Sequence, residues 1–201
     1  FTTTGSSILN NIEGMPKSLL FWRSFTHWIG GMGVLVFVMA IIPASDRSIH
    51  LLRAEVPGPI VGKLVPKIKE TAKILYLIYI AMTVLEIILL KLGNMSWFDS
   101  CVHAFGTAGT GGFSISNISI EAYSSYSQYV IAVFMIIFGI NFTMYYFILI
   151  GNFKDVLKNE EIKWYFGIII ASVVLVCISI FNRCANFEET FRLSLFQVAS
   201  I

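Results

Sequence analysis

Charged residues are scarce in this chain of 201 residues, because Asp, Glu, Lys and Arg make up only 13% of it. Soluble globular domains carry about 25% charged residues, whereas 56% of this chain is hydrophobic. The composition therefore excludes an ordinary soluble domain and favours a membrane protein. The net charge of +2 is also too small for the basic surface that nucleic-acid binding requires, so we expect no nucleic-acid partner.

Cysteine and histidine are rare as well, with three residues of each. The cysteines form no close-spaced pair and the histidines form no H-E-x-x-H motif, so neither a disulfide framework nor a protein-bound metal centre is indicated. No nucleophile, metal cluster or acid pair converges in the sequence. We therefore expect no enzyme activity and no cofactor in this chain.

Long runs with few or no charges are what the chain has instead. Four candidate spans are residues 22–42, 74–90, 129–150 and 164–181. Each is long enough, or nearly so, to cross about 30 Å of hydrocarbon as an α-helix. Arg23 and His27 weaken the first span, and Glu86 is the one charge in the second. The sequence therefore predicts an all-α polytopic membrane protein.

The positions of Lys and Arg predict how these spans are oriented. Residues 44–73 contain six basic residues and residues 151–163 contain three, whereas residues 92–150 contain none. By the positive-inside rule, both basic segments face the cytoplasm. We therefore expect a multi-pass protein of the cell (inner) membrane, surrounded by lipid, whose loops on the opposite side face outward.

One outward loop, residues 105–114 (FGTAGTGGFS), contains four glycines and two threonines. It is a poor phosphate site, since it lacks the Gly-Lys-Ser/Thr sequence of a Walker loop and no Lys or Arg lies nearby. Glycine tolerates positive φ and can turn carbonyl oxygens inward, and the nearest formal charges, Asp99 and Glu121, are negative. The loop therefore suits a cation, with a flexible external turn as the alternative interpretation.

The segment before this loop, residues 96–105 (SWFDSCVHAF), begins with a Ser-x-x-Asp capping pattern. It is too short to span a membrane, so we expect a half-membrane helix that enters from outside and points its partially negative C-terminal end inward. A short helix followed by a Thr/Gly loop is the arrangement of ion-selectivity filters.

The same order of elements recurs along the chain. Residues 1–7 (FTTTGSS) repeat the Thr-Gly step of the glycine-rich loop, and residues 186–200 begin with Asn-x-x-Glu, like the short helix. The chain therefore looks like a piece of a longer polypeptide built from potassium-channel-like repeats of transmembrane helix, re-entrant pore helix, filter loop and transmembrane helix. The expected units are residues 1–70, the end of one repeat; 71–162, a complete repeat; and 163–201, a repeat cut before its filter.

Five stretches resemble the TrkH family of the Trk/Ktr/HKT potassium transporters. They are WRSFTHWIGGMGVLVFVMAIIP (residues 22–43), AEVPGP (54–59), ETAKILYLIY (70–79), HAFGTAGTGGFS (103–114) and GINFTMYYFILIG (139–151). Members of that family join four pore repeats around one ion path. The resemblance implies translocation of K⁺ and a chain that runs from the second filter to just before the fourth.

The resemblance also implies roles for individual residues. Carbonyl groups of a selectivity filter are expected from Thr2, Thr3, Thr4, Gly5, Thr107, Ala108, Gly109, Thr110 and Gly111, with K⁺ placed at Thr4, Gly5, Thr110 and Gly111. Gly139, Asn141 and Phe142 fall where the family's third inner helix breaks into a loop that is regarded as a gate. Taken alone, these residues favour helix packing instead.

Partners follow from the resemblance alone. It implies a homodimer and a cytosolic nucleotide-binding regulatory subunit similar to TrkA, docked on loops such as residues 44–73. A rival function is a Na⁺- or H⁺-coupled secondary transporter of a small solute, which would use an intramembrane carboxylate such as Glu86. Lys91 lies just over one helical turn away, so we expect Glu86 to form a structural pair with it or to lie at the membrane interface.

Overall fold

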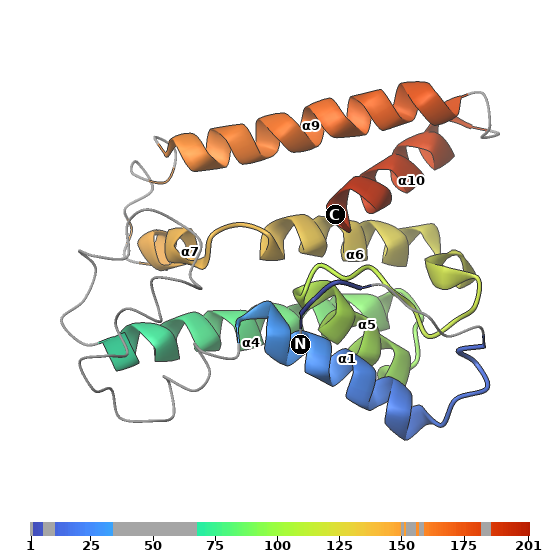
Figure 1. Cartoon of the computed structure of the whole chain (residues 1–201), viewed down its shortest axis with the longest axis horizontal. Helices are drawn as coiled ribbons and strands as arrows, with labels where there is room; N and C mark the ends of the chain where they lie inside the picture. Colours follow the sequence, from blue (N-terminus) through green and yellow to red (C-terminus); the bar gives the residue numbers. More distant parts are fainter. Residues whose placement is uncertain are drawn as a thin grey trace.

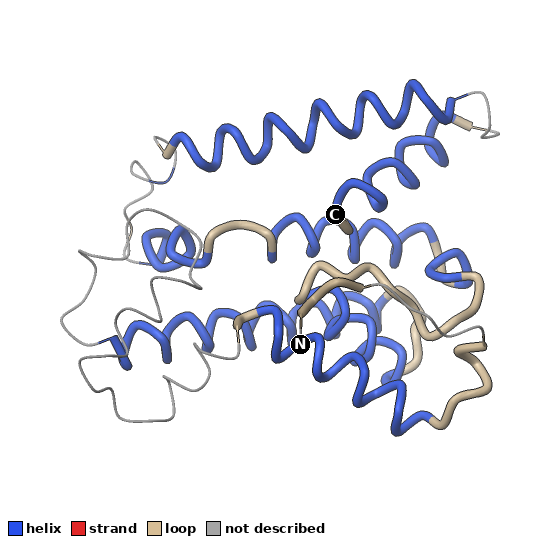
Figure 2. Tube along the Cα trace, in the orientation of Figure 1, coloured by secondary structure: helices blue, strands red, loops and turns tan. Residues whose placement is uncertain are grey.

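The computed structural model describes residues 2–5, 11–33, 68–149, 151, 156, 159–181 and 186–201. Within these residues every regular element is a helix, which confirms the all-α expectation (Figures 1 and 2). The helices are α1 (Lys17–Gly31), α4 (Ile68–Leu92), α5 (Trp97–Ala108), the 3-10 helix η1 (Ser119–Ala122), α6 (Ser125–Phe138), α7 (Phe142–Leu149), α9 (Glu160–Ile180) and α10 (Phe187–Ala199).

Two of the described helices are long and apolar enough to cross a membrane, judged by length and composition. They are residues 72–92 of α4 and the whole of α9. Most side chains of α9 are exposed, among them Ile168, Leu175 and Ile178, as expected of a helix that faces lipid or another part of an assembly. The span expected at residues 22–42 is described only to Gly33, and the basic segment of residues 44–67 lies outside the described residues.

The candidate span at residues 129–150 is not one continuous helix, and it is interrupted where the family resemblance implied a break. Helix α6 ends at Phe138, and α7 begins at Phe142 after a short loop, which Figure 2 shows between two helical segments. Gly139 and Ile140 still bond back to Met135 and Ile137, so the helix ends with a tightened last turn before the direction changes. An apolar run therefore contains a break that hydropathy alone could not locate.

The short helix α5 lies inside the protein, in contact with α1, α4 and α6 (Figure 1). Its buried residues are mostly small: Ser100, Val102, His103, Ala104, Gly106, Thr107 and Ala108. Small side chains let helices approach closely. The helix α5 is too short to span a membrane, but its neighbours surround it with protein. Backbone that does not span a membrane is tolerated within it only when protein or a water-filled path surrounds it.

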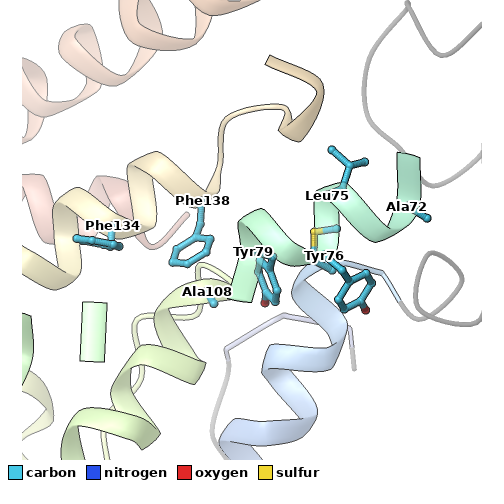
Figure 3. Packing of buried hydrophobic residues seen from close by; sticks show 8 residues of the cluster. Ala72, Leu75, Tyr76, Tyr79, Ala108, Phe134 and Phe138 are labelled. Atoms are coloured by element: carbon cyan, nitrogen blue, oxygen red, sulfur yellow. The ribbon is translucent and has the colours of Figure 1, made fainter. Parts of the chain in front are cut away.

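Helix α4 turns one face toward this short helix. Its buried residues follow the helical repeat of three or four positions, with Leu75 and Tyr76 side by side on the same face: Ala72, Leu75, Tyr76, Tyr79, Thr83, Glu86 and Leu90. Tyr79 is fully buried, and its ring centroid lies 5.4 Å from that of Phe138, in the cluster that Figure 3 shows. Its hydroxyl donates to the carbonyl of Trp28 over 2.7 Å, so the core ties α4 to α1 and α6.

Candidate ion-conduction site

The start of α5 follows the predicted capping pattern. Ser96 has an extended backbone, and its Oγ accepts a hydrogen bond from the backbone N–H of Asp99 over 3.1 Å. This bond satisfies one of the free donors of the first turn, and the Asp99 carboxylate lies where the helix dipole favours negative charge. The similar pattern at Asn186 also starts a helix, α10, but the Asn186 side chain makes no capping bond.

The end of α5 lies three residues later than expected. The helix runs through Thr107 and Ala108, so these two predicted filter residues form its last turn. The N–H of Thr110 bonds to the carbonyl of Thr107 over 2.7 Å, and the N–H of Gly111 bonds to that of Gly106 over 3.0 Å. These two bonds are a Schellman motif, in which the filter loop itself caps the helix.

Thr110 holds the left-handed position of this motif, with φ +57°. Glycine is usual there, and a β-branched residue with positive φ is strained. Such strain costs about 1–3 kcal/mol and persists only where the surroundings enforce it. The backbone at Thr110 is therefore under local constraint, as at many functional sites.

Residues with positive φ alternate with ordinary residues in both predicted filter loops. They are Thr3 and Gly5 in the first loop, and Thr110 and Gly112 in the second. A left-handed residue beside an ordinary one can bring successive backbone groups of one kind to the same side of the chain, as a carbonyl-lined filter requires. By conformation, Gly5 corresponds to Gly112, one position beyond the sequence match with Gly111.

The two loops lie against each other. A Cβ atom added to Gly5 would lie 2.6 Å from the carbonyl oxygen of Gly111, so only glycine fits at this contact. In the first loop, the hydroxyls of Thr2 and Thr4 form a hydrogen bond of 3.0 Å. Phe1 and residues 6–10 lie outside the described residues. The structure thus brings together segments that are more than 100 positions apart in the chain.

Side chains of α1 hold the second loop from one side. The Nε2 atom of His27 lies 3.1 Å from the carbonyl oxygen of Gly109, which also accepts from the Thr110 hydroxyl. Arg23 donates to the carbonyl of Ser114 over 3.3 Å, and its guanidinium carbon lies 4.1 Å from the ring centre of Phe113. The two polar residues that weakened the first predicted span are therefore contacts of the loop.

His103 of α5 holds the same loop from within its own repeat. Its Nδ1 donates to the carbonyl of Asp99 over 2.7 Å, and its Nε2 lies 2.9 Å from the hydroxyl of Ser114. Both groups are buried. The sequence marked His103 only as a scattered histidine, and its helical spacing from Asp99 was the signal that could have indicated a structural role.

The break between α6 and α7 is stabilised by hydroxyl donors. Tyr165 of α9 donates to the carbonyl of Ile136 over 2.8 Å, and Tyr145 of α7 donates to the carbonyl of Ile137. A helix break leaves backbone carbonyls without their intrahelical donors, and these hydroxyls satisfy two of the carbonyls beside it. Neither tyrosine was predicted, since their contacts are set by the packing of the helices.

The predicted gate residues all lie at this break. A Cβ atom on Gly139 would overlap the Tyr165 hydroxyl, and the Asn141 amide lies 3.4 Å from both carboxylate oxygens of Glu161. Phe142 is the first residue of α7, and its ring centroid lies 5.8 Å from that of Tyr79. The break is therefore packed against α4 and α9.

A cavity of about 520 Å³ adjoins both the filter loop and the break. Thr110 and Gly139 line it, with the apolar residues Met135, Ile168, Ile169, Val176, Val198, Ala199 and Ile201 and the polar residues Tyr165 and Ser172. A few polar groups in an apolar wall are typical of sites and paths for small solutes.

Glu86 does not form the expected pair with Lys91. The Glu86 side chain is fully buried, and neither carboxyl oxygen has a hydrogen-bond partner among the described residues. Lys91 instead donates to the carbonyl of Met95 over 3.2 Å and lies over the ring of Trp97. Among the described residues no group of three His, Cys, Asp or Glu side chains could hold a metal ion.

Known proteins are similar to this chain in sequence and in fold. The family model for TrkH, described as a cation transport protein, matches residues 1–183. The Trk system potassium uptake protein TrkH of Escherichia coli K12 is 34% identical over all of this chain and 43% of its own length. The corresponding protein of Halomonas elongata is 36% identical over 72% of this chain and 31% of its own length.

A solved structure agrees with these sequence matches. The crystal structure of the potassium transporter TrkH from Vibrio parahaemolyticus superposes with a TM-score of 0.79 and 28% identity, over 99% of this chain and 41% of that one. This chain thus spans less than half the length of the relatives it matches. It is a polytopic membrane protein with pore-helix repeats, and it belongs to the TrkH family of the Trk/Ktr/HKT superfamily.

Proposed function

We propose that this chain forms the central part of a protein that moves K⁺ across the cell membrane through a selectivity filter and past an intramembrane gate. The single observation that carries the proposal is the contact between the two Thr/Gly loops, where Gly5 approaches the Gly111 carbonyl so closely that no side chain fits. Relatives named as potassium uptake proteins support K⁺ as the transported ion.

In the proposed filter, backbone carbonyls replace the water around K⁺. The carbonyls of Thr110 and Gly111 are the strongest candidates in the second loop, because no hydrogen bond to either is present within the described residues. The carbonyl of Thr107 already accepts the Thr110 N–H, and that of Gly109 accepts from His27. Thr2, Thr3, Thr4, Gly5 and Ala108 complete the proposed set.

The proposed gate is the break between α6 and α7, with Gly139, Asn141 and Phe142. The cavity that adjoins both Thr110 and Gly139 supports this role, because an ion leaving the filter would meet the break next. Non-helical backbone is tolerated at membrane depth where it lines a path.

The wider assembly is part of the same proposal. Residues 1–70, 71–162 and 163–201 would be parts of three consecutive pore repeats, with the filter loops facing outward. The intact protein would be a homodimer that binds a cytosolic nucleotide-binding regulatory subunit similar to TrkA. The name "Trk system" of the relatives supports further components.

Coupled transport by Na⁺ or H⁺ is the second candidate, and buried Glu86 favours it. A carboxyl group without a donor inside a membrane helix is a functional candidate by default. The Thr107 hydroxyl lies beside this carboxyl but donates its hydrogen to the carbonyl of His103 over 2.8 Å, so Glu86 is close to the filter helix and receives no hydrogen bond from it within the described residues.

Ion flux in liposomes separates these two functions. The full-length gene product that contains this chain would be reconstituted, and uptake of Rb⁺ as a K⁺ analogue would be followed with and without gradients of Na⁺ and pH. Our proposal predicts Rb⁺ flux that K⁺ inhibits and that needs neither gradient. Uptake that requires a Na⁺ or pH gradient would support coupled transport and contradict passive conduction.

A further inference from the structure

Among the contacts of the second filter loop, that of His27 joins two of the proposed repeats. His27 belongs to α1, which follows the first loop, yet its Nε2 reaches the Gly109 carbonyl of the second loop over 3.1 Å. A carbonyl can only accept, so Nε2 carries the hydrogen and donates. The side chain is 6% exposed, and its ring meets that of Phe113 edge to face at 4.9 Å.

Gly109 and Gly111 both lie directly against the His27 ring. A Cβ atom on Gly111 would lie 2.5 Å from Nε2 of His27, and one on Gly109 would overlap Cδ2. Neither glycine has the left-handed backbone that would itself require glycine, since Gly109 has φ −97° and the positive φ values of this loop are at Thr110 and Gly112. The space that the imidazole occupies therefore excludes a side chain at Gly109, and at Gly111 it does so together with the Phe113 ring, whose Cδ1 would lie 2.9 Å from an added Cβ.

We propose that His27 is a positioning residue of the selectivity filter, and this inference rests on the proposed function. Its Nε2–H holds the Gly109 carbonyl, and its ring fills the hollow left by Gly109 and Gly111. The peptide between Gly109 and the strained Thr110 is thus held in one orientation. The inner helix of one repeat thereby sets the geometry of the next repeat's filter.

The first test separates the donor from the ring. His27→Gln keeps a side-chain N–H donor, whereas His27→Leu keeps apolar bulk without one. In Rb⁺ and Na⁺ flux assays of the full-length protein, we expect the Leu variant to lower the K⁺/Na⁺ selectivity ratio about tenfold and the Gln variant to keep most of it. Equal ratios in the two variants would overturn the role of the donor.

The second test is a double-mutant cycle with Gly111→Ala. The added methyl group should destabilise the protein while His27 is present and should cost much less when His27→Ala has removed the nearer of its two obstacles, which leaves the Phe113 ring free to shift. The matched control is Gly167→Ala in α9, where an added Cβ meets nothing within 4 Å. Thermal unfolding in detergent measures this arm, so it stands even where ion flux fails to follow the proposed function.

The outcomes of the cycle are distinct. We expect the midpoint loss caused by Gly111→Ala to fall by more than half in the His27→Ala background, with no such coupling for Gly167→Ala. Additive losses at Gly111 and His27 would overturn the spatial relation between them. Coupled losses without K⁺-selective flux in the parent protein would contradict the proposed function but leave the packing of His27 in place.

Discussion

Tyr165 supplies a hydrogen bond that the helix break needs, so Tyr165→Phe tests whether the break limits ion flux. The substitution removes the donor to the Ile136 carbonyl, 2.8 Å away, and keeps the ring. A buried carbonyl left without a donor costs about 1–3 kcal/mol. Because the Tyr165 side chain is only half-buried, water can partly replace the bond, and we expect a cost near 1–1.5 kcal/mol.

This cost converts directly into a shift of population. At 25 °C, 1–1.5 kcal/mol corresponds to about a 5- to 13-fold change in an equilibrium constant. If the observed arrangement of the break obstructs the path, destabilising it should raise K⁺ flux by up to that factor. The K⁺/Na⁺ selectivity ratio should not change, because Tyr165 makes no described hydrogen bond to the filter loops.

The assay is Rb⁺ uptake into liposomes, with Na⁺ competition to measure selectivity. Tyr126→Phe is the matched control, since that tyrosine lies in α6 but is 45% exposed and away from the break. Unchanged flux accompanied by a lower unfolding temperature would refute the gating argument and leave Tyr165 a packing residue. A changed selectivity ratio would refute the separation of gate and filter.

Three further predictions concern the surroundings of the filter. Ser96→Ala should lower the free energy of unfolding by about 0.5–2 kcal/mol, measured by thermal denaturation, because it removes the cap of α5. Glu86→Met should raise it by about 1–3 kcal/mol, because a buried carboxyl without a donor is removed; loss of all flux in this variant would instead favour coupled transport. Hydrogen bonds from Ser116 and the Asn117 backbone lower the pKa of Glu13 from 4.5, so the contact it makes should be stable above pH 4.5 and weaken as the pH falls through the lowered value. The protection of the Asn117 amide against hydrogen exchange, taken relative to its intrinsic rate, should show this pH dependence, and Glu13→Gln should abolish it.

Local patterns predicted the parts of the site that are local in the chain. The Ser-x-x-Asp pattern placed the start of α5 at Ser96 because a cap and its partner are only three residues apart. The end of α5 was placed too early, because Gly106 was counted with the loop although it lies inside the helix. The break at Gly139 was expected only from the family resemblance, since the run of apolar residues continues on both sides of it.

Contacts between distant segments could not be predicted in this way. His27 and Gly109 are 82 positions apart, and Tyr165 and Ile136 are 29 apart, so no local spacing relates them. The expected pair between Glu86 and Lys91, which does not form, could have been ruled out from the sequence. Glu86 continues the buried face of α4 between Thr83 and Leu90, whereas Lys91 is displaced by about 100° from Leu90 around the helix.

The end of α5 also bears on whether the filter loop would bind a cation or an anion. The last carbonyls of a helix carry its partial negative charge, but those of Gly106 and Thr107 are already bonded to the N–H groups of Gly111 and Thr110. The same bonds use up two N–H donors of the loop that an anion would need. Under the proposed function, a cation would therefore meet the carbonyls of Thr110 and Gly111, which accept no hydrogen bond within the described residues, and it would need no acidic side chain.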